Sequence, residues 1–188
     1  IFLRPRDIAV YVGEGVIDVG VSGRDLTLDS RANVEELLEL QFGHANFRLA
    51  VPRGATLDLH ADPPTRIATS FTHLLADYLA EVGSKANIIA LDGAVELAPS
   101  LGVADAVADV VQTGRTLIEA GLEPVGDALL SSQAVLLSRK GTTLSAAAQV
   151  LVDRVRGVVV ASQYVLLEYD ITETHVQAAA EITPGLEA

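Results

Sequence analysis

The sequence predicts an α/β protein built from two lobes, and two patterns support this prediction. Between residues 66 and 121, short apolar runs alternate with segments of helical period, which is typical of strand–helix units with parallel strands. From Leu122 to Arg139 the chain gives extended runs with no helix between them, so we expect it to return there to the lobe in which it began. The 188 residues are enough for one large domain or two small ones with cores of their own.

The N-terminal part predicts two helices and two strands. The helices are expected over residues 6–13, where apolar side chains share a face and a glycine follows, and over residues 33–40, where three apolar side chains come together. The strands are expected over residues 16–23, which end in small side chains, and over residues 46–51, which end before a proline.

Three strand–helix pairs are expected next. In each pair a short apolar run leads into a segment with an apolar stripe at helical spacing, and a glycine closes each helix. The strands are predicted over residues 66–70, 87–91 and 105–111, and the helices over residues 72–83, 93–102 and 114–121. After the extended stretch, we expect a long helix over residues 143–159, a strand over residues 163–171 and a last helix over residues 172–182.

These elements predict a cleft. The chain leaves the first lobe near residue 50 and returns near residue 130, so we assign residues 1–48 and 132–188 to the first α/β lobe and residues 49–131 to the second. Two crossing strands between lobes give a periplasmic-binding-protein-like architecture of type II. Ligands of such folds bind in crevices outside the carboxyl ends of parallel strands.

The composition narrows the function classes. The net charge of −12 argues against a broad nucleic-acid interface, although a local site can still bind a small anion. Without cysteine the chain has no disulfide and no thiolate chemistry, which fits a cytoplasmic protein. No apolar run approaches the roughly 20 residues of a membrane helix. The N-terminus lacks the layout of a signal peptide, and the histidines show no metal-binding spacing.

The segment "DVVQTGRTL", residues 109–117, is the first candidate site. A strand leads through a glycine-containing turn into a helix, whose first N–H groups have no partner within the helix and therefore favour an anion. The threonine hydroxyls and the arginine suit a phosphate monoester, and the aspartate suits ribose hydroxyls or a metal. The alternative is an ordinary helix cap. The candidate residues are Asp109, Thr113, Gly114, Arg115 and Thr116.

A pair of acids forms the second candidate. Asp92 and Glu96 follow a strand and lie four residues apart, so both can face one side of a helix start. Beside a phosphate loop they would hold sugar hydroxyls or Mg²⁺. The alternative is a pair of first-turn acids that the helix dipole favours.

Two further strand ends carry polar groups. Arg24 and Asp25 follow Ser-Gly, with Arg4 near the end of the preceding segment, and these side chains either bind a second ligand from the first lobe or are surface charges. Thr69 and Ser70, between a strand and a helix, form either another anion site or an ordinary cap.

Taken together, these segments resemble the ATP phosphoribosyltransferase family, which opens histidine biosynthesis. The similarity is greatest to the family's long, single-chain form from actinobacteria and covers nearly the whole chain. It implies an enzyme of the glycosyltransferase class that transfers the phosphoribosyl group of phosphoribosyl pyrophosphate (PRPP) to N1 of ATP, releases pyrophosphate and requires Mg²⁺. The matching stretches are "FLRPRDIAVYVGEGVIDVGVSGRDL", "RIATS", "LDGAVELAPSLGVADAVADVVQTGRTL" and "ITPGLE".

The resemblance also implies roles for the candidate residues. No residue would act as a nucleophile, because the reaction needs positioning and neutralisation of charge. Glu96 and Asp109 are the candidates for contact with Mg²⁺ held through the substrate. Family members form dimers and hexamers, which implies a homo-oligomer. The PRPP site would comprise Asp109, Thr113, Gly114, Arg115, Thr116, Glu96 and Asp92, and the ATP site Arg4, Arg24, Asp25, Thr69 and Ser70.

The chain departs from the family in three places. The family begins with a strand and a lysine-containing loop upstream of residue 1, and its long form has a histidine-binding regulatory domain that would start after Ala188. We therefore expect a catalytic-core fragment, without histidine feedback. The third departure is Phe71, Thr72 and His73 in place of the family's Tyr-Pro-Asn, which removes a hydroxyl and a rigid turn.

Two other function classes stand beside the enzyme. A non-catalytic, two-lobed protein that binds small anions would use the same cleft, and pyrophosphate release from ATP and PRPP would distinguish the two. Another class of phosphoribosyltransferase carries paired acids before a Thr-Gly loop. Here Ala108 precedes Asp109, which disfavours that class.

Overall fold

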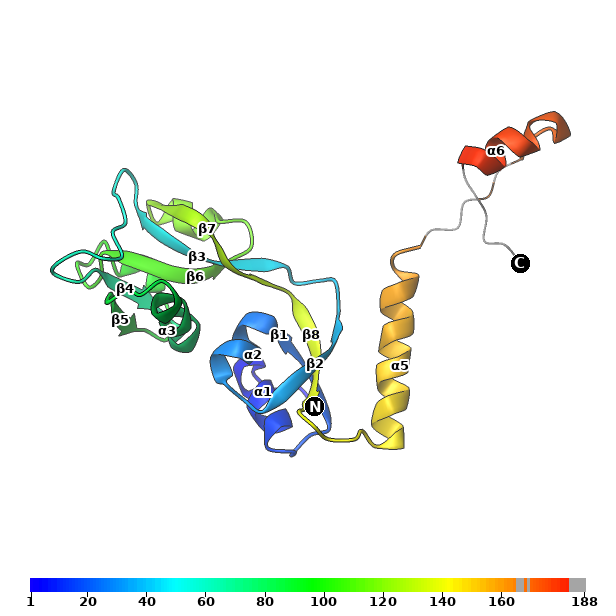
Figure 1. Cartoon of the computed structure of the whole chain (residues 1–188), viewed down its shortest axis with the longest axis horizontal. Coiled ribbons are helices and arrows are strands. Elements are labelled where there is room, and N and C mark those ends of the chain that lie inside the picture. The colour runs from blue at the N-terminus through cyan, green and yellow to red at the C-terminus, as the bar shows by residue number, and fades with distance from the viewer. Residues whose placement is uncertain (165–167, 169, 183–188) are drawn as a thin grey trace.

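The computed structural model describes residues 1–164, 168 and 170–182, and the chain forms two β-sheets. Figure 1 shows the sheets side by side, joined by two crossing stretches of chain, with α5 beside the smaller sheet and α6 farther away. Among the described residues, no helix is long and apolar enough to cross a membrane.

The smaller sheet has the strand order β1–β8–β2, and both pairings are antiparallel. Together with helices α1 and α2 we call it the three-stranded unit. Its core forms where Ala9 and Val12 pack against Val135 and Leu137, all four being fully buried. The elements are α1 (Pro5–Gly13), β1 (Val19–Gly23), α2 (Arg24–Ser30), β2 (Val34–Glu39) and β8 (Ala134–Arg139).

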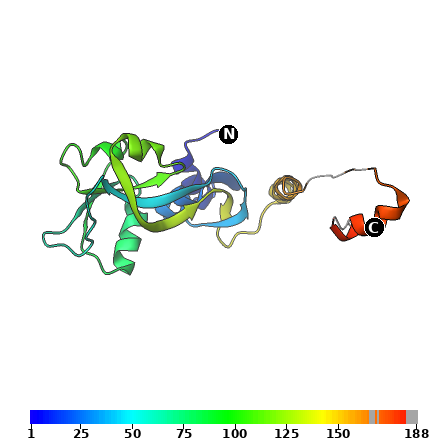
Figure 2. The ribbon, with the colours of Figure 1, turned by 90° about the horizontal axis from the view of Figure 1, so that it is seen from above.

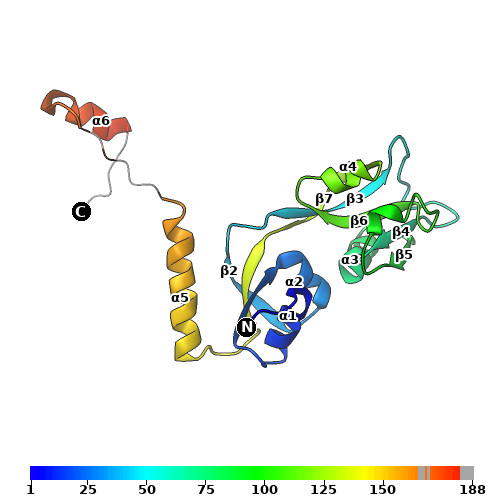
Figure 3. The same cartoon turned by 180° about the vertical axis from the view of Figure 1, so that it is seen from behind.

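The larger sheet has the order β5–β4–β6–β3–β7 and defines the five-stranded unit. Strands β5, β4 and β6 run parallel, whereas β3 pairs antiparallel with both β6 and β7. Figure 3 shows α3 and α4 on opposite sides of this sheet. The elements are β3 (Ala45–Pro52), β4 (Arg66–Thr69), α3 (Thr72–Glu81), β5 (Asn87–Ala90), the 3₁₀ turn η1 (Val95–Leu97), β6 (Ala106–Val111), α4 (Arg115–Glu119) and β7 (Leu122–Ser132).

Each face of the larger sheet has its own core. Alternate residues of a strand point to opposite faces, so Phe47 and Leu49 pack with Ile67 and Leu75 on the α3 side. Ala50 and Val107 join a second cluster, on the side of η1 and α4. The parallel strands are therefore covered on both faces, which their almost entirely apolar sequence requires.

The chain crosses between the sheets twice, and the two crossings lie side by side. The N–H of Leu40 donates to the carbonyl of Ala134 at 3.0 Å, and the N–H of Ala134 donates to the carbonyl of Phe42 at 2.9 Å. On the side of the larger sheet, Ala45 is the register partner of Ser132. Figure 2 shows this region from above.

The C-terminal helices follow β8. Helix α5 (Ala146–Ala161) begins at Ser145, whose side chain accepts a hydrogen bond from the N–H of Ala148, and it packs through Val152 against the smaller sheet. A 3₁₀ turn, η2 (Glu173–His175), leads into α6 (Val176–Ile182).

Most of the predicted elements are confirmed. The structure contains the helix expected over residues 6–13, the strands expected over residues 46–51 and 66–70, and the long helix expected over residues 143–159. The predicted strand–helix alternation with parallel strands is also confirmed for β4, β5 and β6.

The helix predicted over residues 33–40 is wrong, because the segment forms strand β2. Its apolar residues Val34, Leu37 and Leu38 have helical spacing, but the segment pairs with β8 and is therefore a strand. The first five residues of β8 are buried, so its backbone groups need partners on both sides, and β1 supplies only one side. A register shift between Glu36 and Leu38 fits the spacing to the strand.

The helix predicted over residues 93–102 is also wrong. Only the single turn η1 forms, because Ala94 adopts a left-handed conformation with φ of 49° and Pro99 has no N–H to extend a helix. The strand predicted over residues 163–171 includes residues 165–167 and 169, and the "TPGLEA" tail comprises residues 183–188. These lie outside the described residues.

Candidate functional site

The carboxyl end of β4 leads into a tightly held turn. Thr69, the last residue of β4, is fully buried, and its hydroxyl accepts a hydrogen bond from the N–H of Phe71 at 2.9 Å. The Phe71 ring packs against Phe47, with 5.6 Å between the ring centroids. Ser70 is thereby presented between two anchored residues, at the edge of the sheet where ligands of parallel strands bind.

The N-terminus of α3, which follows this turn, already has a partner. The carboxylate of Asp29, from α2, accepts the N–H of His73 at 2.9 Å and the N–H of Leu74 at 3.1 Å. The side chain of Phe71, at the N-cap position, makes no capping bond. The first N–H groups of α3 are therefore capped by Asp29 of the other unit and not by Thr69 or Ser70, which the ordinary-cap alternative required.

Asp109 on β6 is an acid with a raised pKa near this edge. Burial raises the pKa of the Asp109 carboxyl, while the hydrogen bond that it accepts from the N–H of Val110, at 2.8 Å, lowers the pKa. The charges of Glu96 and Asp25 raise the pKa of Asp109 further, and that of Arg6 lowers it. These groups therefore act on one another although they come from four different elements.

The turn after β6 contains a glycine in a backbone conformation that favours glycine. Gly114 has φ of 73°, a left-handed conformation, and a side chain there would meet no atom within 4 Å. Helix α4 begins at the next residue. The Thr113 hydroxyl lies 3.5 Å from the N–H of Arg115, at the limit of a hydrogen bond, so the polar groups of this turn remain available.

Arg115 itself is paired only at the surface. Its Nε donates to Glu119 at 2.8 Å, and the side chain is 82% exposed. A surface pair of this kind contributes little to stability, so the guanidinium can turn to another anion at small cost.

Asp92 and Glu96 do not share a helical face, because the predicted helix does not form. Asp92 is exposed ahead of η1, whereas Glu96 lies within η1 and is partly buried. Only Glu96 influences the Asp109 carboxyl.

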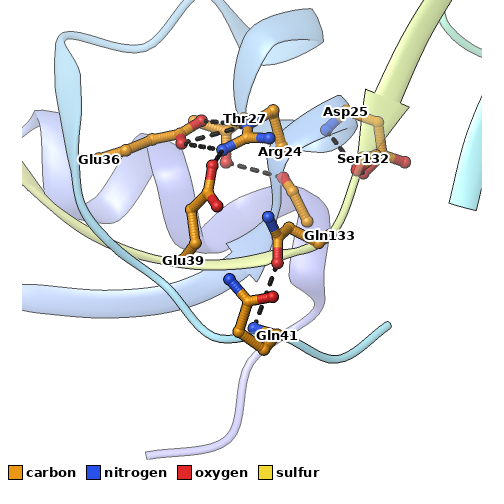
Figure 4. Close-up of polar contacts among 9 residues, drawn as sticks. Arg24, Asp25, Thr27, Glu36, Glu39, Gln41, Ser132 and Gln133 are labelled. Carbon is orange, nitrogen blue, oxygen red and sulfur yellow. Dashed lines mark hydrogen bonds and ion pairs between the residues drawn. The ribbon is translucent and has the colours of Figure 1, made fainter. Parts of the chain in front are cut away.

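Arg24 and Asp25, at the start of α2, are both engaged by protein groups (Figure 4). The Arg24 guanidinium donates to Glu36 at 2.8 Å and to Glu39 at 2.6 Å, and these carboxylates raise the pKa of Arg24. The same contacts lower the pKa of Glu39. Arg24 thus ties the start of α2 to β2.

Asp25 is buried at the end of β7. Its Oδ1 accepts the hydroxyl of Ser132 at 2.6 Å, and its N–H donates to the same hydroxyl at 3.1 Å. Arg4, in contrast, is exposed at the N-cap position of α1. Of the three residues predicted for a second ligand from the first lobe, only Arg4 has its side chain in solvent.

Arg6 and Asp29 take part in this region although the sequence did not single them out. The Arg6 guanidinium contacts Ser70 and Phe71, and Asp29 caps α3. An exposed cation in the first turn of a helix was the only local signal for Arg6. Its partner lies 64 residues away, so local reasoning does not reveal the contact.

Within the described part of the chain, no three or more His, Asp or Glu side chains gather closely enough to hold a metal ion by themselves. Of the residues predicted to contact Mg²⁺, Glu96 and Asp109 act on each other electrostatically. Oxygen ligands of this type suit Mg²⁺, which proteins commonly bind through one or two carboxylates together with substrate phosphates.

Comparison with known proteins gives consistent results. The family model described as ATP phosphoribosyltransferase matches residues 4–157. An ATP phosphoribosyltransferase of Pseudarthrobacter chlorophenolicus is 53% identical over 100% of this chain and 67% of its own length. One of Salinibacter ruber is 50% identical with the same coverage. The chain thus spans about two thirds of the length of these relatives.

Solved structures agree with the sequence comparison. A chain of the ATP phosphoribosyl transferase (HisG:HisZ) complex from Thermotoga maritima has a TM-score of 0.76 and 28% identity, over 86% of this chain and 79% of that one. The arginine-bound form of truncated ArgBP from T. maritima has a TM-score of 0.56 and 15% identity, over 87% of this chain and 76% of that one, which is a likeness of fold alone. The predicted α/β, periplasmic-binding-protein-like fold class is confirmed.

Proposed function

Because the chain belongs to the ATP phosphoribosyltransferase family, we propose that its cleft transfers the phosphoribosyl group of PRPP to N1 of ATP with release of pyrophosphate, the first step of histidine biosynthesis. The observation that carries the proposal from family to site is the partly buried Asp109 on β6, four residues before Thr113 of the Thr-Gly-Arg-Thr turn. We assign the two sheets to the two lobes and the substrate cleft to the side on which α1 and α2 contact the turn after β4.

The PRPP side of the cleft lies on the five-stranded unit. We assign the 5′-phosphate to Thr113, Gly114, Arg115 and Thr116, whose open turn offers N–H groups, hydroxyls and an exposed guanidinium. Asp109 accepts hydrogen bonds from the ribose hydroxyls, and these bonds would offset the cost of keeping its partly buried carboxylate charged.

The reaction needs no protein nucleophile. Positive charge builds on the ribose as the bond to pyrophosphate breaks, so the site has to align ATP with the ribose and balance charge. Carboxylates at Glu96 and Asp109 suit both the developing charge and a substrate-bound Mg²⁺. Asp92, exposed in the same segment, would join them only at the rim. When bound, Mg²⁺ supplies neutralisation of the departing pyrophosphate.

The ATP side of the cleft combines both units. We assign Arg4 and Ser70 to it directly, because Arg4 is exposed and Ser70 is presented by the turn after β4. Thr69 is fully buried, so we assign it to the ATP side as the residue that holds this turn through Phe71. Arg24 and Asp25 complete the assignment. To contact nucleotide, Arg24 would have to exchange Glu36 or Glu39 for ligand, and Asp25 would have to share its carboxylate with Ser132.

We further propose a cytoplasmic homo-oligomer, a dimer or hexamer, with histidine as feedback inhibitor only where a regulatory domain is present. The relatives are named as enzymes of one reaction, which favours catalysis over binding alone. A non-catalytic anion-binding protein would take up PRPP or ATP without releasing pyrophosphate.

The first experiment is calorimetric titration of Mg²⁺–PRPP into the wild-type chain and into a Thr113→Ala, Arg115→Ala double variant. We expect binding that the double variant loses by tenfold or more, since charge-assisted bonds to phosphate are removed. Arg156→Ala is the matched control, because Arg156 is also an exposed arginine paired with a carboxylate of its own helix. A folded wild-type chain that does not bind Mg²⁺–PRPP would contradict the assignment of this turn.

A further inference from the structure

Arg6 joins the two units at the turn that presents Ser70. From the first turn of α1, its Nη1 donates to the carbonyl of Ser70 at 3.1 Å and its Nη2 donates to the hydroxyl of Ser70 at 3.0 Å. A planar guanidinium can make two such bonds at once, and the pair fixes both the position of the backbone and the rotamer of the hydroxyl.

The same guanidinium also contacts the next residue. Its central carbon lies 4.8 Å from the centre of the Phe71 ring, within the range of a cation–π interaction. Phe71 is in turn packed on Phe47 of the larger sheet. Arg6 therefore holds Ser70 from one side while the core holds Phe71 from the other.

Asp29 adds a second tie between the same elements. Its carboxylate caps α3 through His73 and Leu74, and its backbone carbonyl lies 2.6 Å from Nδ1 of His73. Oδ2 of Asp29 is 3.9 Å from Nη1 of Arg6. Asp29 is nearly buried, with 11% of its side chain exposed, while Arg6 is 50% exposed, so Asp29 provides a fixed anion beside a cation that has room to move.

We propose that Arg6 is a positioning residue for ATP: it holds the Ser70–Phe71 turn in the geometry that the ATP side of the cleft requires. The inference rests on the proposed function, because that function assigns Thr69 and Ser70 to ATP. The PRPP turn lies after a different strand, and Arg6 reaches the PRPP side through its charge, which lowers the pKa of Asp109. Arg6 acts through Ser70 rather than by touching the reacting atoms.

An alternative role for Arg6 is direct contact with a substrate phosphate. A lysine at position 6 can replace the arginine in direct contact with a phosphate, but not in holding the Ser70 turn. A lysine supplies a point charge for a phosphate, but it cannot make the paired bonds to the carbonyl and hydroxyl of Ser70 in the planar geometry of a guanidinium. The two roles also differ before any substrate is added, because only a positioning residue changes the turn in the free protein.

The test compares Arg6→Gln and Arg6→Lys with Arg31→Gln. Arg31 is the matched control, since it also joins the two units, through a 2.5 Å contact with Asp77 on α3, but does not touch the Ser70 turn. For each variant we measure hydrogen–deuterium exchange of residues 69–73 without ligand and the calorimetric affinities for ATP and for Mg²⁺–PRPP. The thermal midpoint reports whether the variant remains folded.

We expect Arg6→Gln to speed exchange of residues 69–73 and to weaken ATP binding by about tenfold, as removal of hydrogen bonds to a charged group does. PRPP affinity should fall less than ATP affinity, because Arg6 acts on Asp109 of the PRPP side only through its charge. Arg31→Gln should leave exchange, ATP affinity and PRPP affinity near wild type. Arg6→Lys should recover only part of the ATP affinity.

Two results would overturn the inference. One is unchanged exchange of residues 69–73 in Arg6→Gln, and the other is full recovery of ATP affinity in Arg6→Lys, which would assign Arg6 to the phosphate directly. A wild-type chain that binds neither ATP nor PRPP, yet shows faster exchange in Arg6→Gln, would contradict the proposed function while the effect of Arg6 on the turn stands.

Discussion

Two turns of the molecule have nearly the same sequence and opposite surroundings. Ser22-Gly23-Arg24 ends β1 and begins α2, and Thr113-Gly114-Arg115 follows β6 and begins α4. In the first turn the glycine has φ of −74° and the arginine side chain is 20% exposed, held by two glutamates. In the second the glycine has φ of 73° and the arginine is 82% exposed.

The two turns show which properties follow from the short Ser/Thr-Gly-Arg motif and which follow from its surroundings. Both turns lead into a helix, so both provide N–H groups that lack a helical partner. Neighbouring elements then decide the use of those groups. Strand β2 and Ser132 occupy the polar groups of the first turn, whereas the second turn remains open for a ligand.

The two glycines give the largest expected difference. A side chain at Gly23 would lie 2.4 Å from Oδ1 of Asp25, an oxygen that Ser132 holds in place, so Gly23→Ala should lower the free energy of unfolding by about 2 kcal/mol. Gly114→Ala has open space but an unfavourable φ, and should cost about 1 kcal/mol. Urea denaturation of both variants measures the difference. If both variants lose the same free energy of unfolding, the Asp25 carboxylate moves aside freely, and the first turn is not more tightly held than the second.

The next effect concerns the acid before the open turn. Asp109→Asn removes a carboxylate that burial keeps at a raised pKa, so it should weaken PRPP binding about tenfold and raise the thermal midpoint at pH 7. A raised pKa favours the folded state only while the carboxyl is protonated, so wild-type stability falls as pH rises through that pKa. The stabilisation by Asp109→Asn should therefore disappear at low pH.

Asp153→Asn, on the exposed surface of α5, is the control for that pair of measurements and should change neither PRPP affinity nor the midpoint appreciably. If Asp109→Asn weakens PRPP binding but does not raise the thermal midpoint, the carboxylate of Asp109 does not destabilise the folded protein through burial.

Smaller effects are expected from the two arginines. Arg24→Gln leaves Glu36 and Glu39 beside each other without their shared cation and should lower the thermal midpoint by about 2 °C. Arg115→Gln removes only an exposed pair on one helix and should lower it by less than about 1 °C. Equal shifts in scanning calorimetry would contradict the distinction between an engaged and an open turn.

The pH dependence of the Arg24 effect is the smallest expected signal. Arg24 lowers the pKa of Glu39, so the stability that this pair provides is present above the ordinary pKa of a glutamate and is lost as pH falls through the lowered value. The midpoints of wild type and Arg24→Gln should converge below about pH 4. A constant difference down to pH 3 would mean that Arg24 acts through packing.

The sequence predicted local features well where one pattern excluded the others. Parallel β4, β5 and β6 follow from short apolar runs separated by helical segments, and the turn before α4 follows from an apolar strand with Thr-Gly-Arg shortly after it. Strand β2 was missed because the spacing of Val34, Leu37 and Leu38 also fits a helix, and only the unmet hydrogen bonds of β8 favour a strand.

Because β2 was predicted as a helix, the ion pairs of Arg24 were not predicted either. As a strand, β2 brings Glu36 and Glu39 to the Arg24 guanidinium, a contact that no helix over residues 33–40 was expected to make. The role of Arg6 was hidden for a similar reason, since Ser70 belongs to the other unit. Contacts between units depend on how the two sheets face each other, and local patterns carry no information about that.

The paired crossings have a consequence for how such a chain can be assembled. Ala45 and Ser132 stand opposite each other as register partners, so everything between them leaves and re-enters the smaller unit at a single point. The segment between them is one uninterrupted insertion whose two ends lie side by side. Such an insertion can be gained, exchanged or removed while the flanking residues still fold together.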